Sequence, residues 1–412
     1  MEKVVRVSNS IARVADVIRR VSSSAIPSRS VLRLEELLWV REPVEDSGEF
    51  TATLLEYSSR LLIARRPYHG GVYVTPVGLD SSSRYLETPA ADIVIGGVAS
   101  MSSHGFTLVE WPSLELGYSP PAPHPVFYIL PGSGAQLDID DPLVSTVNPA
   151  GRSFDINYSV VEACDEMRFS LENWVLDLIP DLFNNLKLRN PVVLVDGPLY
   201  VVAKVLMRDA PLWLRETWAK LLVARVNAIR KLEDMGVPVL GVVKRVERST
   251  ILSKTRGLEG LRGDVLEGDK SIVLKSMLAI DEKLPGRIYV TPKILVRMPL
   301  VTGVGVLSKV VQYVVIPAGK YQLSPELARV FRVEYTPRTM ELLGELGLDP
   351  VDVVSFDSVA KGALEPVSIK LSDWRSSFIT YVLKRSLSMN IIRIGVPLGY
   401  WSLREAELSW GM

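Results

Sequence analysis

The most constraining feature of this sequence is a short, wholly apolar segment, Pro191-Val192-Val193-Leu194-Val195, followed by Asp196-Gly197. A strand without a polar side chain is typical of a sheet whose two faces are both covered by helices. Strand-like and helix-like segments alternate along the chain after residue 71. The sequence therefore predicts an α/β fold in which helices flank a mixed sheet.

The other predicted elements follow from β-branched and aromatic runs for strands, and from apolar residues three to four positions apart for helices. The predicted strands cover residues 72–79, 93–99, 106–111, 126–130 and 237–246. The predicted helices cover residues 158–188 and 212–235. Pro180 would end or kink the first of these helices, so two shorter helices are an alternative.

Two segments fall outside this alternation and define the predicted domain organisation. Residues 1–66 carry apolar residues at helical spacing in three stretches, near 11–21, 32–38 and 54–62, and predict a helical N-terminal region. We interpret this region as a flank of the core rather than as an arm for a partner. Residues 112–153 are rich in Pro, Gly and Ser and predict an insertion loop within a single domain over 67–412.

The composition excludes several classes of protein. A chain of 412 residues with 47% hydrophobic residues can bury a large core. Its 47 basic and 47 acidic residues cancel, so a site for a polyanion must come from local clustering. The single cysteine, Cys164, rules out an internal disulfide framework, and the three histidines are not at zinc-site spacing. Without an apolar run of signal-peptide or membrane-span length, we expect a soluble, cytoplasmic protein with no membrane association.

Two of the predicted strands end in an aspartate followed by a small residue, at Leu79-Asp80-Ser81 and at Val195-Asp196-Gly197. Ligands of open α/β sheets commonly bind at the carboxyl ends of strands, so Asp80 and Asp196 are candidates for one shared site. Mg²⁺ and Mn²⁺ prefer oxygen ligands, and two ions held there could activate water and stabilise the leaving oxygen of a phosphodiester. Each aspartate could instead cap a helix or a turn, and the repeated pattern leaves the two interpretations near parity.

Glu172 is the candidate for a third carboxylate ligand. It lies on the helix predicted between the two aspartates, with Arg168 one turn earlier. On spacing alone, an ordinary ion pair between these two side chains, worth roughly a few tenths of a kcal/mol, is the favoured interpretation.

The order of these motifs resembles that of the NurA family of archaeal DNA nucleases, over roughly residues 70–410. The resembling segments are Gly78-Leu79-Asp80-Ser81-Ser82-Ser83-Arg84, Arg168-x-x-x-Glu172, Val193-Leu194-Val195-Asp196-Gly197-Pro198-Leu199, Pro238-Val239-Leu240-Gly241-Val242-Val243-Lys244-Arg245 and Phe331-Arg332-Val333-Glu334. The resemblance implies an RNase H-like core in which Asp80, Glu172 and Asp196 bind Mn²⁺ or Mg²⁺. It also implies a homodimeric DNA nuclease, a 5'-3' exonuclease or single-strand endonuclease, that works with a HerA-type hexameric ATPase in DNA end resection.

The sequence departs from the family pattern near its end, where the family has Leu-x-x-Ala-His. Glu407 stands where that histidine is expected. A glutamate can still bind a hard metal ion, so a site of four carboxylates is expected, but Glu407 cannot act as a neutral imidazole. Tyr400 matches, with an offset of one residue, a tyrosine that the family places near the site. Pro198 stands where the family usually has serine, which removes a backbone N–H but leaves Asp196 in place.

Basic residues outnumber acidic ones over residues 204–262, although the whole chain is neutral. Lysine and arginine side chains that neutralise phosphates are the main source of affinity for nucleic acid. The predicted DNA-binding residues are Arg84, Lys244, Arg245 and Arg248. Solvated helix faces explain such a run of charges equally well.

Two alternatives to an active nuclease remain open at this point. The first is a catalytically impaired relative that serves as a DNA clamp or ATPase adaptor, which the replacement of histidine by Glu407 favours. The second is a phosphotransferase of the actin-like fold, which also has strands that end in Asp-Ser or Asp-Gly. Its late glycine-rich motif would have to be Gly303-Val304-Gly305-Val306, which is too short, and no Walker motif is present.

Overall fold

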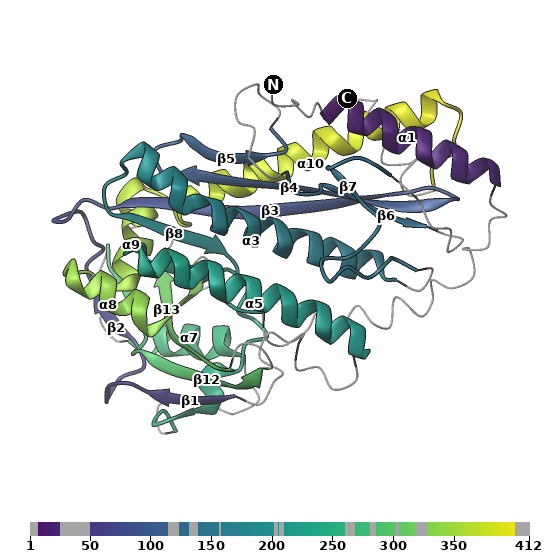
Figure 1. Ribbon diagram of the computed structural model, residues 1–412. Coiled ribbons are helices and arrows are strands. Elements are labelled where there is room, and N and C mark those ends of the chain that lie inside the picture. Colours follow the sequence, from purple (N-terminus) through teal and green to yellow (C-terminus); the bar gives the residue numbers. More distant parts are fainter. Residues whose placement is uncertain are drawn as a thin grey trace.

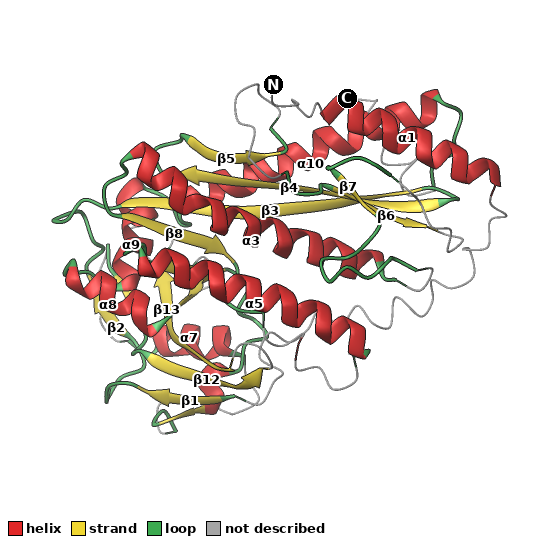
Figure 2. Cartoon of the chain, viewed as in Figure 1, coloured by secondary structure: helices red, strands yellow, loops and turns green. Residues whose placement is uncertain are grey.

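The computed structural model describes one large sheet with helices packed on it. The described residues are 7–24, 50–113, 123–131, 139–155, 158–201, 205, 210–259, 268–280, 286–301, 305–317 and 328–399. Within these residues, 14 strands form a single mixed sheet (Figure 1 and Figure 2). The predicted α/β class, a mixed sheet flanked by helices, is confirmed.

The half of the sheet that carries the predicted aspartates combines antiparallel and parallel pairs. Its strands are β3 (Thr75–Glu87), β4 (Ala91–Ser102), β5 (Thr107–Trp111), β6 (Phe127–Pro131), β7 (Val144–Ser145), β8 (Pro191–Asp196) and β9 (Val239–Val243). β3 pairs antiparallel with β4 on one side and parallel with β8 on the other, and β8 pairs parallel with β9. β3 and β8, which carry the two aspartates, are therefore neighbours.

The other half of the sheet continues from β9 and is mainly antiparallel. Its strands are β14 (Arg329–Tyr335), β13 (Gly305–Ile316), β12 (Ile294–Val301), β1 (Thr51–Leu54), β10 (Thr255–Arg256), β11 (Ile288–Val290) and β2 (Ile63–Arg65). β14 joins the two halves because it pairs with β9 on one side and with β13 on the other. Figure 2 shows this second group of strands below β8.

Helices cover the sheet and extend its core. They are α1 (Val7–Ser24), α3 (Val160–Leu186), α5 (Leu212–Asp234), α6 (Ile251–Lys254), α7 (Asp269–Leu278), α8 (Pro337–Glu345), α9 (Pro350–Asp357), the 3-10 turn η3 (Val359–Lys361) and α10 (Val367–Arg393). α5 packs beside α3, and α1 packs beside α10 (Figure 1). Among the described helices, none combines the length and the hydropathy needed to cross a lipid bilayer.

Two adjacent glycines of β4 show that α3 and α10 lie on opposite faces of the sheet. A Cβ on Gly96 would come within 2.5 Å of Met167 in α3, and a Cβ on Gly97 would come within 2.9 Å of Ile379 in α10. Successive residues of a strand point to opposite faces. Both helices thus approach β4 at positions where only glycine leaves enough room.

The structure confirms most of the elements predicted between residues 71 and 246. The helix predicted at 158–188 is α3, and Pro180 lies inside it without dividing it. Its start is set by Ser159, whose hydroxyl accepts a hydrogen bond from the Glu162 N–H, as is usual for an N-cap serine. The strand expected within the proline-rich insertion is β6, and α5 begins and ends close to its predicted limits.

The prediction of a wholly helical N-terminal region is wrong in part. The first stretch forms α1, but the third runs from the end of β1 to the start of β2 and forms no helix. β1 pairs with β12 and β2 pairs with β11. Pairing with strands that lie far along the chain outweighs the helical spacing of the leucines, which is a weaker local preference. Residues 32–38, predicted as a second helical stretch, lie outside the described residues.

The predicted strand end just before Asp80 is also wrong. β3 runs on to Glu87 because its second half stays paired with β4. β8, however, pairs with β3 only as far as Leu79, opposite Val195, and ends at Asp196. Asp80 therefore lies level with the carboxyl end of β8, although it is in the middle of its own strand.

Candidate functional site

A pocket of about 500 Å³ opens where β8 ends beside β3. It is bounded by β3, the turn after β8, the end of β9, α3 and α10. Its lining residues are Asp80, Ser81, Ser82, Ser83, Arg168, Asp196, Gly197, Pro198, Val243, Lys244, Arg245 and Asp373. The structure thus brings together both predicted aspartates and two of the predicted DNA-binding residues, Lys244 and Arg245.

Asp80 is a buried carboxylate in an acidic environment. Its side chain accepts a hydrogen bond of 2.9 Å from the Ser376 hydroxyl of α10, and the residue is 4% exposed. Burial raises the pKa of Asp80 to about 8, and the negative charges of Asp196, Glu172 and Asp373 contribute in the same direction. Near neutral pH, such a carboxyl becomes fully ionised only when additional positive charge is placed beside it.

Asp196 has a cation beside it. The Lys244 ammonium lies 2.6 Å from Asp196 Oδ2, and it comes from the residue just past β9. Burial nevertheless raises the pKa of Asp196 above its ordinary value, although Lys244 acts to lower it. Burial would lower the pKa of Lys244, but the charge of Asp196 raises it overall, so the lysine stays protonated.

Glu172 has partners other than the two aspartates. Its Oε1 accepts a hydrogen bond of 2.6 Å from Ser81, and its Oε2 lies 2.6 Å from the guanidinium of Arg225 in α5. Arg225 is fully buried, also donates to the side chain of Asn173, and lies 4.1 Å from the ring centre of Phe169. The structure therefore places Glu172 on the α3 side of β3, next to the pocket rather than in its lining.

Arg168 links α3 to the same strand. Its guanidinium donates a hydrogen bond of 3.1 Å to the carbonyl oxygen of Ser81. Burial would lower the pKa of Arg168, but the charges of Glu172 and Asp80 raise it overall. The side chain thus brings a permanent positive charge to the pocket and fixes the backbone beside Asp80.

Asp373 is a pocket residue that the sequence analysis missed. It lies on α10, one turn before Ser376, and its carboxylate raises the pKa of Asp80. One signal for this helix was present in the sequence, since small polar residues recur every four positions at Ser368, Ser372 and Ser376. All three are fully buried, and the row lets α10 lie close to β3. A Cβ on Gly78 would come within 2.3 Å of the Ser368 backbone.

Comparison with known proteins identifies the family of this chain. The model of the NurA domain matches residues 74–378, more than half of the chain. The chain belongs to the NurA family. Among solved structures, the crystal structure of the NurA nuclease from Sulfolobus solfataricus is similar, with 14% sequence identity and a TM-score of 0.43 over 100% of this chain and 97% of that chain. No curated protein matches.

The matched NurA region contains the pocket but not every residue predicted for it. Asp80, Glu172, Asp196 and Asp373 fall inside the matched range. Glu407 and Tyr400 do not, and both lie outside the described residues, so their predicted roles stay predictions.

Two of the predicted DNA-binding residues lie outside the pocket lining. Arg84 is on β3, just beyond the pocket residue Ser83, and its guanidinium carbon lies 6.0 Å from the ring centre of Tyr381. Arg248 is exposed on the segment that follows β9. Arg84 thus directly follows a lining residue of β3, whereas Arg248 lies three residues beyond the lining residue Arg245 along the chain.

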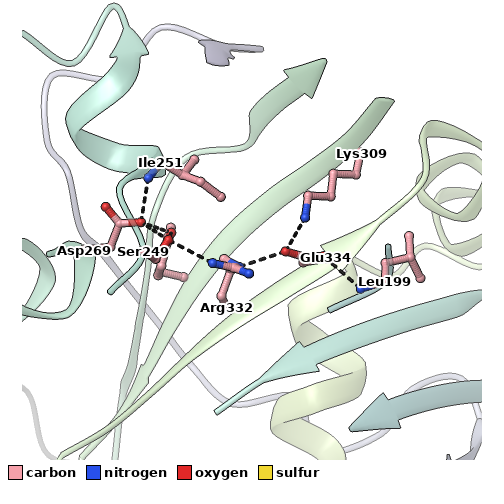
Figure 3. A network of polar contacts seen from close by, with 8 residues as sticks. Leu199, Ser249, Ile251, Asp269, Lys309, Arg332 and Glu334 are labelled. Carbon is pink, nitrogen blue, oxygen red and sulfur yellow. Dashed lines mark hydrogen bonds and ion pairs between the residues drawn. The ribbon is translucent and has the colours of Figure 1, made fainter. Parts of the chain in front are cut away.

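A buried ionic network supports the turn that follows Asp196 (Figure 3). Glu334 of β14 accepts a hydrogen bond of 2.9 Å from the backbone N–H of Leu199, and lies 2.6 Å from Lys309 and 2.8 Å from Arg332. A Cβ on Gly241 would come within 2.7 Å of the Leu199 nitrogen, so the turn also needs glycine in β9. The motif around Glu334 thus anchors the turn that follows Asp196.

The same network extends into the second half of the sheet. Arg332 donates a hydrogen bond of 2.9 Å to Ser249. Asp269 accepts hydrogen bonds from the Ile251 N–H, at 2.9 Å, and from the Ser249 hydroxyl (Figure 3). It also accepts from the Leu252 N–H, at 2.9 Å, and from the Tyr313 hydroxyl. Every charged group in this cluster therefore has a partner of opposite charge or several hydrogen bonds, as buried charges require.

The pocket fits a divalent cation. Asp80 and Asp196 supply hard oxygen ligands from adjacent strands, and burial together with neighbouring negative charge raises the pKa of Asp80, so a cation there would favour its ionised form. Within the part of the chain that the structure describes, no group of three or more His, Cys, Asp or Glu side chains is arranged to hold one ion. A bound ion would therefore complete its coordination with water or substrate oxygens, as Mg²⁺ commonly does.

Proposed function

We propose that this NurA-family protein is a divalent-metal-dependent deoxyribonuclease that cuts DNA at the Asp80–Asp196 pocket. The observation that carries the proposal is the juxtaposition of the buried Asp80 and the half-buried Asp196 at the end of β8, where burial raises the pKa of both carboxyls and the charge of Asp196 raises that of Asp80 further. The family assignment favours this chemistry over that of an actin-like phosphotransferase.

Asp80 and Asp196 would hold Mn²⁺ or Mg²⁺. When bound, such an ion supplies an activated water and stabilises the charge that develops on the phosphodiester. Ser376 orients Asp80 through its hydrogen bond, and the Leu199–Glu334 contact fixes the turn that carries Asp196. Asp373 lies on the same pocket and would hold metal-bound water or take part in coordination.

The basic residues of the pocket would bind the DNA backbone. Lys244 and Arg245 line it at the end of β9, and Arg168 lines it from α3. Lys244 is in contact with Asp196, so it can shift its hydrogen bonds to a phosphate when a cation takes its place. Phosphate contacts of this kind would make binding fall steeply with salt.

Glu172 would act in this site through Ser81 rather than as a direct ligand. Its two oxygens are taken by Ser81 and Arg225, and its release toward a metal would leave the fully buried Arg225 without that partner. We therefore propose that Glu172 orients the strand next to Asp80. Its role as a metal ligand, which the family resemblance implied, would require a rearrangement of α3 or α5.

A catalytically impaired clamp or adaptor is the second candidate function. It is favoured by one observation, the presence of Glu407 where the family has histidine. Both functions are compatible with a homodimer in the cytoplasm that works with a HerA-type hexameric ATPase in DNA end resection. If Glu407 has impaired the site, Glu407→His should raise nuclease activity, whereas a site that works with four carboxylates should lose activity.

The test of the primary proposal is cleavage of labelled single-stranded DNA by the full-length protein with Mn²⁺. Asp80→Asn and Asp196→Asn should each reduce the rate by at least about a thousandfold, since each removes a ligand charge. The matched control is Asp177→Asn on the exposed side of α3, which should retain the wild-type rate. Equal rates in all three variants would rule out the metal-site assignment, and an inactive wild-type protein that still binds DNA would favour the clamp.

A further inference from the structure

A row of exposed aromatic side chains runs along the outer face of α10. Trp374, Phe378 and Tyr381 are 60%, 42% and 41% exposed. They are spaced four and three residues apart, so they share one face of the helix. The rings of Trp374 and Phe378 are stacked, with centres 6.0 Å apart and an interplanar angle of 16°. Large aromatic residues in such an arrangement are unusual on a surface that faces only water.

Cations are interleaved with these aromatic rings. Arg84 lies over the ring of Tyr381, and Lys384 lies over the ring of Tyr85, each at 6.0 Å from the ring centre. α10 as a whole carries a single acidic residue, Asp373, against five basic residues, one of which, Arg375, is paired with Glu110 of β5. The basic residues of α10 are Lys370, Arg375, Lys384, Arg385 and Arg393. This local positive charge stands out in a chain whose net charge is zero.

The row begins at the carboxylate pocket. Asp373 lines the pocket, and Trp374 is the next residue of α10. On the strand side, Ser83 lines the pocket, and Arg84 and Tyr85 follow it directly. β8 does not extend alongside this part of β3, since its pairing stops at Leu79. Both elements therefore lead from the pocket onto the same aromatic and basic surface.

We propose that this surface, the α10 ridge, binds single-stranded DNA and leads it to the pocket. The α10 ridge consists of Arg84, Tyr85, Trp374, Phe378, Tyr381 and Lys384. Unpaired bases stack on aromatic side chains, and a basic surface follows the phosphates, which is how sequence-independent single-strand sites are built. From Trp374 to Tyr381 the helix rises by about 10 Å, the length of roughly three stacked nucleotides. The inference rests on the proposed nuclease function, for which it names the form of DNA that is bound.

The observations favour DNA over a second copy of the chain as the occupant of the α10 ridge. A surface that pairs with its own copy would place the basic residues of one subunit against those of the other. A polyanion neutralises the same residues. Base stacking also accounts for flat, exposed rings next to cations, which a purely apolar protein contact would not need.

The experiment measures binding without cleavage, so it does not depend on the nuclease activity. Fluorescence anisotropy of labelled oligo(dT), about 20 nucleotides long, is recorded with the full-length protein in EDTA. Trp374→Ala combined with Phe378→Ala should weaken binding by about tenfold or more, since the loss of one stacked base weakens binding by roughly five- to more than a hundredfold. Tyr57→Ala is the matched control, because Tyr57 is 91% exposed and follows β1 in the other half of the sheet.

Further measurements distinguish base stacking from other causes of a change in DNA affinity. An abasic oligodeoxynucleotide of the same length should bind the wild-type protein more weakly than oligo(dT), and the double variant should bind the two equally. Lys384→Gln should reduce the salt dependence of binding, because one phosphate contact is lost. Sedimentation velocity of the double variant should match that of the wild type.

Unchanged affinity for oligo(dT) in the double variant overturns the inference, as does a wild-type protein that does not bind oligo(dT). A loss of affinity together with altered sedimentation also overturns it, since the α10 ridge would then hold a second copy of the chain. If the protein proves unable to cut DNA but the double variant loses base-dependent binding, the inference stands and the nuclease proposal fails.

Discussion

Two buried clusters of charge, one on each side of β8 and β9, differ in how their carboxylates are balanced. Glu334 has no solvent exposure and lies against Lys309 and Arg332. Burial would raise the pKa of Glu334, but these two cations lower it overall. Asp80 is almost as buried, and there burial raises the pKa to about 8, with the charges of Asp196, Glu172 and Asp373 acting in the same direction.

The difference between Glu334 and Asp80 distinguishes a buried charge that stabilises the fold from one that is available to a ligand. A buried ion that the chain itself neutralises stabilises one arrangement of the backbone, here the turn after Asp196. A buried carboxylate that the chain leaves unbalanced lowers stability, and such groups concentrate where a ligand supplies the missing charge. The next four experiments test whether the two clusters behave in these opposite ways.

The largest expected effect is the pH dependence that Asp80 imposes on the metal-free protein. Because its folded pKa is about 8 and its ordinary value is 3.8, the folded state binds more protons between these limits. Stability should therefore fall as the pH rises from about 4 to about 8, by at most about 1.4 kcal/mol per pH unit. Asp80→Asn should flatten this dependence and make the protein more stable at pH 8, as urea unfolding in EDTA would measure. A pH profile that is the same in Asp80→Asn and in wild type would contradict this account of Asp80.

Glu334→Gln should have the opposite effect on stability. It leaves Lys309 and Arg332 buried without their anionic partner, which costs about 3–5 kcal/mol when one member of a buried pair is removed. Urea unfolding measures the loss. Glu341→Gln is the control, since Glu341 is exposed and changes at such positions usually stay within about 0.5 kcal/mol. A Glu334→Gln protein as stable as wild type would show that the network around Arg332 is not a structural charge cluster.

The same contrast explains which parts of the site the sequence could predict. Asp80 and Asp196 were found because each stands beside a recognisable strand and is followed by a small residue. The parallel pairing of β3 with β8 then brought them together. The exact end of β3 could not be predicted, because pairing with β4 keeps the strand extended past Asp80.

Contacts between distant segments account for what the sequence analysis missed. The family resemblance implied that Glu172 is a metal ligand. Its contact with Arg225, 53 residues away, could not be predicted because no sequence signature marks Arg225 as its partner. Asp373 lies 293 residues from Asp80 along the chain and reaches the pocket only because α10 packs against β3. The row of small polar residues on α10 indicated a closely packed helix, but not the strand that it covers. The family resemblance supplied the order of the motifs and not these long-range contacts.

The gain in folding stability on metal binding is the effect of intermediate size. A cation that binds only the folded pocket stabilises the protein by about 2.7 kcal/mol at a concentration one hundred times its dissociation constant. The increase in stability with Mn²⁺ should be lost in Asp80→Asn and in Asp196→Asn, as differential scanning fluorimetry would show. Asp177→Asn should keep the full increase. An equal increase in all of these variants would place the cation elsewhere on the chain.

The smallest expected effect tests the hydrogen bond that orients Asp80. Ser376→Ala removes a buried hydroxyl that donates to Asp80 at 2.9 Å, and the expected loss is about 1 kcal/mol. This loss should appear mainly above pH 8, where Asp80 is ionised, because a hydrogen bond to a charged acceptor is the stronger one.

A double-mutant cycle of Ser376→Ala with Asp80→Asn isolates the interaction from packing changes in α10. Ser372→Ala is the control for a lost buried hydroxyl, since Ser372 is equally buried on the same helix face but donates to the Ser368 carbonyl and accepts from the Met101 N–H rather than contacting Asp80. A coupling energy near zero would mean that Ser376 fills space beside Asp80 without orienting it. A coupling that grows with pH would show that the chain compensates part of the Asp80 charge by hydrogen bonding and leaves the remainder for a cation.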